Sequence, residues 1–313
     1  MVEADVALAN RLPTTREEWE CRLDRLVREN RFTISVFFPL NGIVLLLASA
    51  EGWLSGTVLA PLAFNGLFIL FGTFVMRSPL LVGVLPHTTR RGATGVGLLT
   101  LYAYLIEYTG VHTGFPYGQF AYGVDLGPTV GGIPLGLPVF FVPLVMNAYL
   151  LCLLLLGERA EHTVIRLCTV IAAVLAMDVV LDPGAVALGF WAYTPSGAFY
   201  GVPLSNYAGW VLSATVAVIL LDWGYDQHIL LARLSECEFM LDDLVSFVIL
   251  WGGLNAWFGN WLPVAVAALF GLGLLKTERF DSRVFRFSRW KRSEENSSKS
   301  DATLTRTPTT LRE

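Results

Sequence analysis

Hydrophobic residues in this chain are gathered into long segments, and short alternating or strongly amphipathic stretches are rare. Most of the segments approach the ~20 residues that an α-helix needs to cross a bilayer. We place eight of them near residues 32–50, 57–76, 93–109, 133–156, 164–182, 207–222, 243–258 and 260–275. The pattern therefore predicts an all-α, polytopic integral membrane bundle of about eight transmembrane helices.

The polar ends of the chain flank this membrane domain, which we expect at residues 32–275. Residues 1–31 have no apolar core of a signal peptide, and we predict a cytoplasmic arm with an interfacial helix. A capping box of Thr14 or Thr15 with Glu17 or Glu18 marks the start of that helix. Residues 276–313 are first basic and then rich in Ser, Thr and Glu, which predicts a cytoplasmic tail whose second part is disordered.

Composition agrees with a membrane protein, because 54% of the residues are hydrophobic and only 15% are charged. Basic charge gives the orientation. With the N-terminus inside, eight spans put all 22 Lys and Arg residues on the cytoplasmic side and none in the four outer loops. We therefore expect both termini to be cytoplasmic in a multi-pass protein of the cell membrane. The net charge of −4 gives no reason to expect nucleic acid as a partner.

The acidic residues between the sixth and eighth hydrophobic segments are expected to form a solvated cytoplasmic surface. This group consists of Asp222, Asp226, Glu236, Glu238, Asp242 and Asp243. The same topology places Arg77 in a cytoplasmic loop at residues 77–92.

Two long outer loops carry an internal repeat. Glu107 is followed thirteen to fifteen residues later by the sequence Phe-Ala-Tyr at 120–122, and Asp178 is followed at the same offsets by Trp-Ala-Tyr at 191–193. Each copy then reaches a Gly-x-Pro-Leu sequence, at 132–135 and at 201–204. Loops of this length between hydrophobic spans are more often functional than connective. We therefore predict two acid-bearing half-sites on the outer side.

Placing a carboxyl group within the hydrophobic part of a membrane costs free energy, so such a group indicates a functional site. Glu107, Asp178 and Asp182 lie toward the outer ends of the third and fifth spans, where no Lys or Arg is available to pair with them. Asp178 and Asp182 share one helical face, and Pro183 is expected to end that helix. Capping or pairing within the bundle remains the structural alternative for all three. Asp125 is expected to be a turn residue.

Aromatic residues concentrate on the same two regions. An interfacial aromatic belt would explain part of this pattern, but their gathering on two loops favours an aromatic-lined pocket. The candidate substrate-binding residues are Tyr108, Tyr117, Tyr122, Trp191, Tyr193, Tyr200, Asn206, Tyr207 and Trp210. The candidate catalytic residues are Glu107, Asp178, Asp182 and His112, which is the one histidine on the outer side. No His, Cys and carboxylate spacing resembles a metal site, so no metal is expected.

Several of these sequences resemble a known family. The chain resembles the CruF-type carotenoid biosynthesis proteins in two runs and three short elements. The runs are Glu107-Tyr-Thr-Gly-Val-His-Thr-Gly-Phe-Pro-Tyr-Gly, and Phe199-Tyr-Gly-Val-Pro-Leu-Ser-Asn-Tyr with Gly209-Trp. The short elements are Leu126-Gly-Pro, Gly132-Ile-Pro-Leu and Leu181-Asp-Pro. The similarity is greatest to their archaeal branch, the bisanhydrobacterioruberin hydratases. It implies hydration of the terminal C=C bonds of a fifty-carbon carotenoid, giving the tertiary alcohols of bacterioruberin, and it implies other carotenoid biosynthesis enzymes as partners.

The chemistry of such a hydration fits the candidate residues. A proton donor must generate a tertiary carbocation, and water must then be delivered to it. A carboxylic acid in apolar surroundings keeps its proton, and aromatic faces stabilise a cation. A second acid, a tyrosine or His112 could orient and deprotonate the water. No cofactor is expected, because the reaction involves no redox change.

A proton-coupled transporter, or a lipid- or isoprenoid-binding protein, is the alternative. A transporter should show ion-coupled flux in vesicles, whereas a hydratase should convert its substrate in detergent without a gradient. A retinal-binding rhodopsin is excluded, because no lysine lies within a predicted span.

Overall fold

The computed structural model describes residues 13–277. Helix α2 (Arg16–Glu29) begins at the expected capping box, in which the Thr15 hydroxyl accepts a hydrogen bond from the Glu18 amide at 3.2 Å. The first twelve residues and, of the predicted C-terminal tail, residues 278–313 lie outside the described residues.

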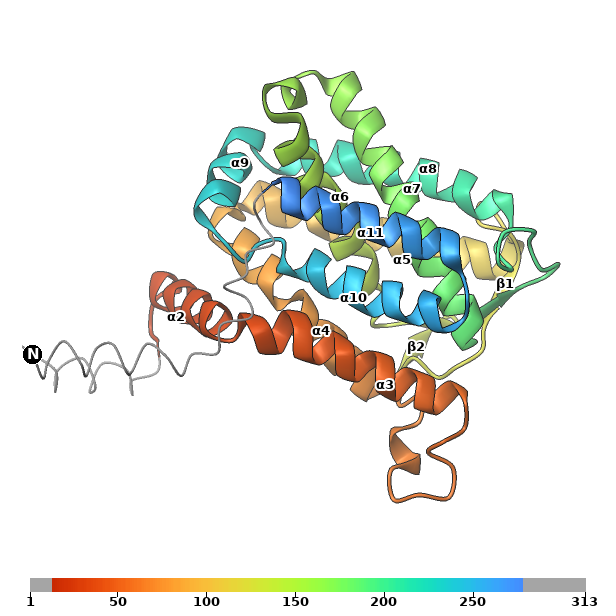
Figure 1. The fold of residues 1–313 in the computed structure, drawn as a ribbon. Helices are drawn as coiled ribbons and strands as arrows, with labels where there is room; N and C mark the ends of the chain where they lie inside the picture. Colours follow the sequence, from red (N-terminus) through yellow and green to blue (C-terminus); the bar gives the residue numbers. More distant parts are fainter. Residues whose placement is uncertain (1–12, 278–313) are drawn as a thin grey trace, which may run out of the picture. The chain divides into compact units, whose positions relative to one another are not determined.

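The described chain is an all-α bundle, as predicted (Figure 1). A π-helical turn (Thr33–Phe37) leads into α3 (Phe38–Ala50), and the following helices are α4 (Gly66–Val84), α5 (Arg90–Thr113), α6 (Leu137–Leu156), α7 (Thr163–Leu188), α8 (Leu204–Gly224), α9 (Gln227–Glu236), α10 (Asp242–Trp257) and α11 (Trp261–Lys276). Five of the described helical segments, those that contain α3, α4, α6, α7 and α8, are long and apolar enough to cross a membrane. The count of eight spans stays a prediction, in which α5, α10 and α11 are the other three.

The predicted boundaries of two spans differ most from the structure. Residues 51–65 form turns and a short 3₁₀ helix (Ala60–Leu62), and α4 begins only at Gly66, where the Asn65 side chain caps the Phe68 amide at 3.0 Å. The predicted second span, 57–76, therefore starts too early and ends too early. Helix α7 does not end at Pro183 but continues to Leu188, because its neighbours hold the segment around the proline.

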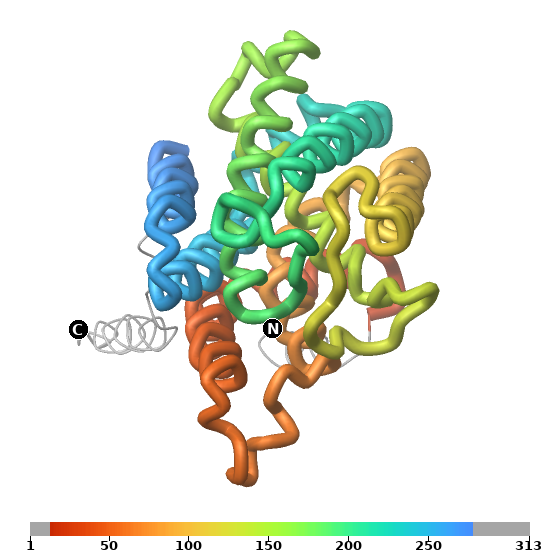
Figure 2. Tube along the Cα trace, turned by 90° about the vertical axis from the view of Figure 1, so that its right-hand side faces the viewer, coloured from red at the N-terminus to blue at the C-terminus, as the bar shows by residue number. Residues whose placement is uncertain are grey.

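The core of the bundle surrounds α6, whose residues 143–153 are buried on all sides. Helices α4, α5, α7 and α8 pack against α6, and α10 packs on α7, α3 and α4. Helices α5 and α8 lie side by side (Figure 2). They can approach closely because glycines line their contact. A Cβ atom on Gly224 would lie 3.4 Å from the Cα of Gly92, so larger side chains would separate the two helices.

The two repeat sequences form strands that pair with each other at one end of the bundle. Strands β1 (Phe120–Tyr122) and β4 (Trp191–Tyr193) are antiparallel, with Phe120 opposite Tyr193 and Tyr122 opposite Trp191. A second small sheet joins β2 (Thr129–Val130) to β3 (Ile133–Pro134). The long loops that follow the third and fifth predicted spans are therefore tied into one lid over the bundle.

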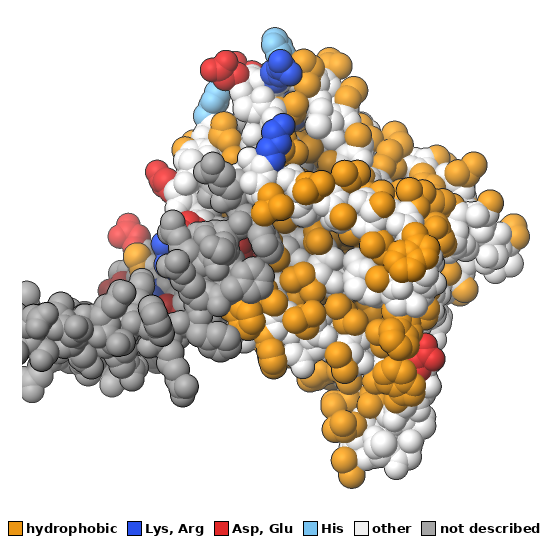
Figure 3. Space-filling model, in the orientation of Figure 1, with side chains coloured by type: hydrophobic (Ala, Val, Ile, Leu, Met, Phe, Trp, Pro, Cys, Tyr) orange, Lys and Arg blue, Asp and Glu red, His pale blue; other side chains and the backbone are white. Residues whose placement is uncertain are grey.

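Figure 3 shows the surface over α3, α10 and α11 covered by hydrophobic side chains, with charged side chains gathered toward the end that carries α9. Large apolar side chains such as Val44, Leu269 and Leu272 are exposed on these helices. An apolar surface of this kind fits a membrane-embedded protein, since such patches are rare on soluble monomers.

Two carboxylates predicted to be solvated are instead buried in ion pairs. Asp243 is fully buried and pairs with Arg77, which lies inside α4 and not in a loop, and it also accepts from Asn147 at 2.6 Å. Asp242 pairs with Arg31 at 2.6 Å. A fully buried carboxylate needs such partners, because unpaired charge away from water is very unfavourable. The sequence did not indicate these contacts, since the partners are far apart along the chain.

We expect Asp243→Ala to lower the free energy of unfolding by about 3–5 kcal/mol, because it leaves the Arg77 guanidinium buried without its partner. Glu20→Ala is the matched control: it removes only the Arg16–Glu20 ion pair at the surface, which should contribute at most about 1 kcal/mol. Thermal unfolding in detergent measures both variants. Equal melting temperatures for the two would contradict a stabilising role for the buried pair.

Candidate functional site

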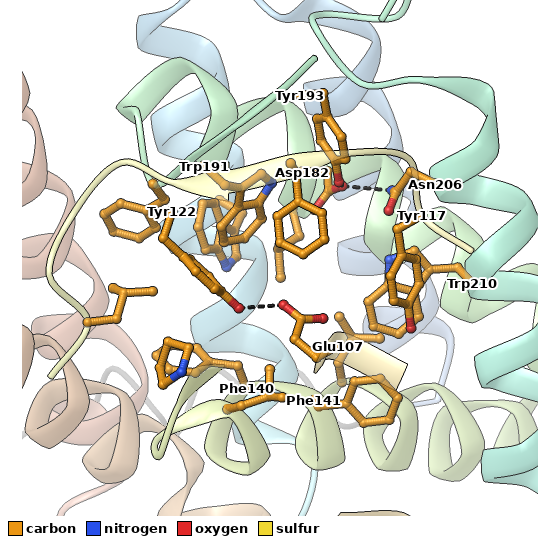
Figure 4. Close-up of a pocket in the computed structure, with 18 residues that line it drawn as sticks. Glu107, Tyr117, Tyr122, Phe140, Phe141, Asp182, Trp191, Tyr193, Asn206 and Trp210 are labelled. Carbon is orange, nitrogen blue, oxygen red and sulfur yellow. Dashed lines mark hydrogen bonds between the residues drawn. The ribbon is translucent and has the colours of Figure 1, made fainter. Parts of the chain in front are cut away.

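A cavity of about 120 Å³ lies below the β1–β4 pair (Figure 4). Its walls come from α5, α6, α7, α8, α10 and the two loops that carry the repeat sequences. The lining residues are Glu107, Tyr117, Phe120, Tyr122, Leu126, Pro134, Leu137, Phe140, Phe141, Leu144, Leu181, Asp182, Phe190, Trp191, Tyr193, Asn206, Trp210 and Trp251. Lys and Arg are absent from this lining, so its two carboxyl groups have no cationic partner there.

Glu107 projects from α5 into one side of the cavity, where the Tyr122 hydroxyl donates a hydrogen bond to its carboxyl group (Figure 4). Burial raises the pKa of Tyr122 well above its usual value, and the charge of nearby Glu107 raises it further. The phenol therefore stays protonated and acts as a donor. The repeat sequence that contains Tyr122 thus fixes the orientation of the carboxyl group thirteen to fifteen residues before it.

Asp182 projects from α7 into the same cavity and is held by two donors. The Tyr193 hydroxyl donates to its Oδ2 atom at 2.8 Å, and the Asn206 amide donates to the same atom at 2.7 Å. Burial raises the pKa of Tyr193, and the neighbouring Asp182 and Asp178 carboxyl groups add to this shift, so this phenol also remains a donor. The two donors fix the orientation of the Asp182 carboxyl group at the cavity wall.

Asp178 lies one turn before Asp182 on α7 and is fully buried. The second N–H of the Asn206 amide donates to its Oδ2 atom at 2.7 Å. Asn206 therefore bridges the two aspartates. Of the two, Asp182 is part of the cavity wall, while Asp178 lies behind it.

Aromatic side chains form most of the remaining wall. Phe141 stacks on Trp210, with ring centroids 5.2 Å apart and an interplanar angle of 19°. Tyr117 packs beside Trp210, and its hydroxyl is 2.6 Å from the Ser213 hydroxyl. The contacts hold these rings in place, so the faces that line the cavity are preorganised.

The structure brings together eight of the thirteen predicted site residues as cavity lining: Glu107, Asp182, Tyr117, Tyr122, Trp191, Tyr193, Asn206 and Trp210. Asp178 touches this group through Asn206. The other four lie outside the lining. His112 and Tyr108 are both exposed, and their rings stack with centroids 4.1 Å apart. Tyr200 is also exposed, and Tyr207 packs against Phe199.

Several lining residues were absent from the predicted site. Phe120 lies in the repeat and is the counterpart of Trp191, so the repeat itself was a signal for it. Phe140 and Phe141 come from α6, which is apolar on nearly every side, and Trp251 comes from the apolar middle of α10. No pattern in such helices indicates which residue faces a cavity.

Asp125 is a turn residue, as predicted, because its Oδ1 atom accepts from the Gly127 amide at 2.8 Å. Within residues 13–277, no three His, Cys, Asp or Glu side chains are grouped so that they could hold a metal ion.

The fold and the cavity define a membrane helix bundle with two carboxyl groups facing an aromatic-lined cavity. The chain belongs to the family of carotenoid biosynthesis proteins, whose model matches residues 64–274. It is 59% identical over 271 residues to the bisanhydrobacterioruberin hydratase of Haloarcula japonica, an alignment that covers 86% of this chain and 91% of that protein. No solved structure matches the chain.

Proposed function

We propose that this protein is a carotenoid hydratase of the cell membrane, which adds water across the terminal C=C bonds of bisanhydrobacterioruberin to give bacterioruberin. The observation that carries the proposal is the cavity in which Glu107 and Asp182 face one aromatic-lined space without a Lys or Arg. The name of the Haloarcula relative supports the substrate, because the two chains are 59% identical.

Glu107 is the proposed proton donor. Its carboxyl group lies among aromatic side chains and accepts one side-chain hydrogen bond, from Tyr122, whereas that of Asp182 accepts two. Transfer of its proton to the less substituted carbon of the terminal double bond leaves a tertiary carbocation and a Glu107 carboxylate. Positioned general acids of this kind contribute roughly 10²–10⁴-fold to rate.

Asp182 is the proposed base. As the carboxylate stabilised by Tyr193 and Asn206, it orients a water molecule and takes its proton as the water oxygen bonds to the cation. The product is a tertiary alcohol. Return of the proton from Asp182 to Glu107 through solvent restores the starting state.

Aromatic faces stabilise the cation between these two steps. Trp191, Trp210 and Phe141 line the cavity, and the negative face of an aromatic ring attracts a cation by roughly 0.5–2 kcal/mol. A Lys or Arg in the same wall would repel the cation and would hold Glu107 as a carboxylate. Its absence from the lining therefore fits the proposed chemistry.

The cavity of about 120 Å³ is far smaller than a fifty-carbon polyene. We therefore propose that one end group enters at a time, while the rest of the substrate stays in the apolar surroundings of the protein.

The proposed hydration needs no cofactor, because no electrons are gained or lost. Protein that has been treated with a chelator and freed of nucleotide and flavin should therefore keep its full rate of hydration. The rate is measured on purified protein in detergent before and after treatment. Activity that returns only after a metal ion or a nicotinamide is added would place the protein in another reaction class.

The proposed function is tested by expressing the protein in a host that accumulates the anhydro-carotenoid and analysing the pigments by mass spectrometry. The expected products carry one added water for each hydrated end. A double variant, Glu107→Gln with Asp182→Asn, is the control at matched membrane expression. Unchanged pigment in cells that contain the wild-type protein and the substrate would overturn the proposal.

A further inference from the structure

The acid pair lies beside a proline inside α7. Pro183 has no N–H group to donate to the carbonyl four residues earlier, and its ring crowds that carbonyl. The helix nevertheless continues for another turn, to Leu188. Two carbonyl groups of this segment accept hydrogen bonds from side chains outside α7: Asn255 donates to Val180 O at 2.7 Å, and Asn260 donates to Pro183 O at 3.4 Å.

Asn255 is fully buried, and its amide is fully used within the protein. Besides Val180 O, it donates to Trp251 O at 2.8 Å, and its own oxygen accepts from the Asn260 amide at 2.9 Å. An asparagine amide has two N–H donors, so Asn255 has none left for a ligand. It acts on α7, not on a substrate.

Helices α7 and α10 approach closely at the same point. A Cβ atom on Gly184 would lie 3.0 Å from the Trp251 ring and 3.2 Å from the Asn255 amide nitrogen. Trp251 is itself part of the cavity wall. The Asn255 contacts therefore join a cavity-lining ring on α10 to the α7 turn that carries both aspartates.

We infer that Asn255 is a positioning residue, which through Val180 and Trp251 holds the interrupted turn of α7 so that Asp182 faces the cavity opposite Glu107. The role assigned to Asp182 rests on the proposed function. Val180 lies between the two aspartates in the chain, so a shift of its backbone would also move Asp182. A displacement of about 1 Å in a catalytic group can lower the rate about 10²-fold.

The variant Asn255→Leu tests this inference, because leucine is close to asparagine in size but donates nothing to Val180 O. We expect kcat to fall roughly 10–10²-fold, with KM changed by less than about 3-fold. Asn41→Leu is the matched control. The Asn41 amide donates only to Phe37 O, within its own exposed helical turn, so kcat should stay within about 2-fold of wild type.

A double-variant measurement separates positioning from a general loss of folded protein. If Asn255 acts through Asp182, Asn255→Leu should cost less than about 2-fold when Asp182→Asn is already present. A merely structural role would give the same fractional loss in both backgrounds. That result would overturn the inference.

An infrared titration makes the test independent of turnover. The carboxyl stretching bands are assigned with Asp178→Asn and Asp182→Asn, and Asn255→Leu is expected to shift them, while Asn41→Leu leaves them in place. If wild-type protein hydrates nothing, the proposed function fails, and these bands still decide whether Asn255 positions the pair. Where Asn255→Leu does not fold, Asn260→Ala gives the same readouts with a smaller expected change, since it removes the longer contact to Pro183 O. Unshifted bands and unchanged kcat in the folded variant would refute the positioning role.

Discussion

Glu107→Gln is expected to lose about 10²–10⁴-fold in the rate of carotenoid hydration while the protein still inserts in the membrane. Glutamine keeps the size of the side chain, and its amide oxygen can still accept the Tyr122 hydrogen bond, but it has no acidic proton to give. The measurement is product formation at matched membrane expression, with the anhydro-substrate accumulating in the variant.

Asp125→Asn is the control for this experiment. Asparagine can accept the same hydrogen bond from the Gly127 amide, so activity should remain close to wild type. Near-normal turnover by Glu107→Gln would show that another group is the acid.

Asp182→Asn is expected to cause a loss of similar size, about 10²–10⁴-fold, but at a later step. In this variant Glu107 can still protonate the substrate, but the amide at position 182 cannot take a proton from the attacking water. In deuterated water, the carbocation then returns a proton to Glu107, and unreacted substrate gains deuterium without hydration. Glu107→Gln should show neither product nor exchange.

Mass spectrometry of the recovered substrate separates these two outcomes. Deuterium in the substrate from Glu107→Gln, and none in the substrate from Asp182→Asn, would reverse the two proposed roles. Loss of exchange in both variants would contradict separate acid and base residues.

The sequence predicted the helix bundle and the equivalence of the two repeats, because both depend on local signals. Long apolar segments specify the spans, and the matched sequences at 120–122 and 191–193 form paired strands. The choice between Asp178 and Asp182 was beyond sequence reasoning. The repeat favoured Asp178, but the cavity reaches the residue one turn further along, in a segment of α7 that continues through Pro183.

The remaining differences come from contacts between residues far apart in the chain. The Arg77–Asp243 pair joins α4 to α10 across 166 positions, and no local pattern distinguishes its aspartate from a solvated one. The sequence also did not show which residues of α6 and of the middle of α10 face the cavity, since a stretch that is apolar all round carries no periodic signal. The sequence predicts His112 as a site residue because it is the one histidine on the predicted outer side, but in the structure it stacks on Tyr108 and is not part of the cavity lining.

The central claim is that the carotenoid gains its hydroxyl groups from water in a reaction catalysed by this protein alone. Purified protein in detergent, without a membrane gradient, is supplied with the anhydro-carotenoid in water enriched in heavy oxygen. The account predicts a product with one heavy oxygen atom in each new tertiary hydroxyl group, and none with the Glu107→Gln and Asp182→Asn double variant. Recovery of unchanged substrate, or a product whose oxygen does not come from water, would contradict it.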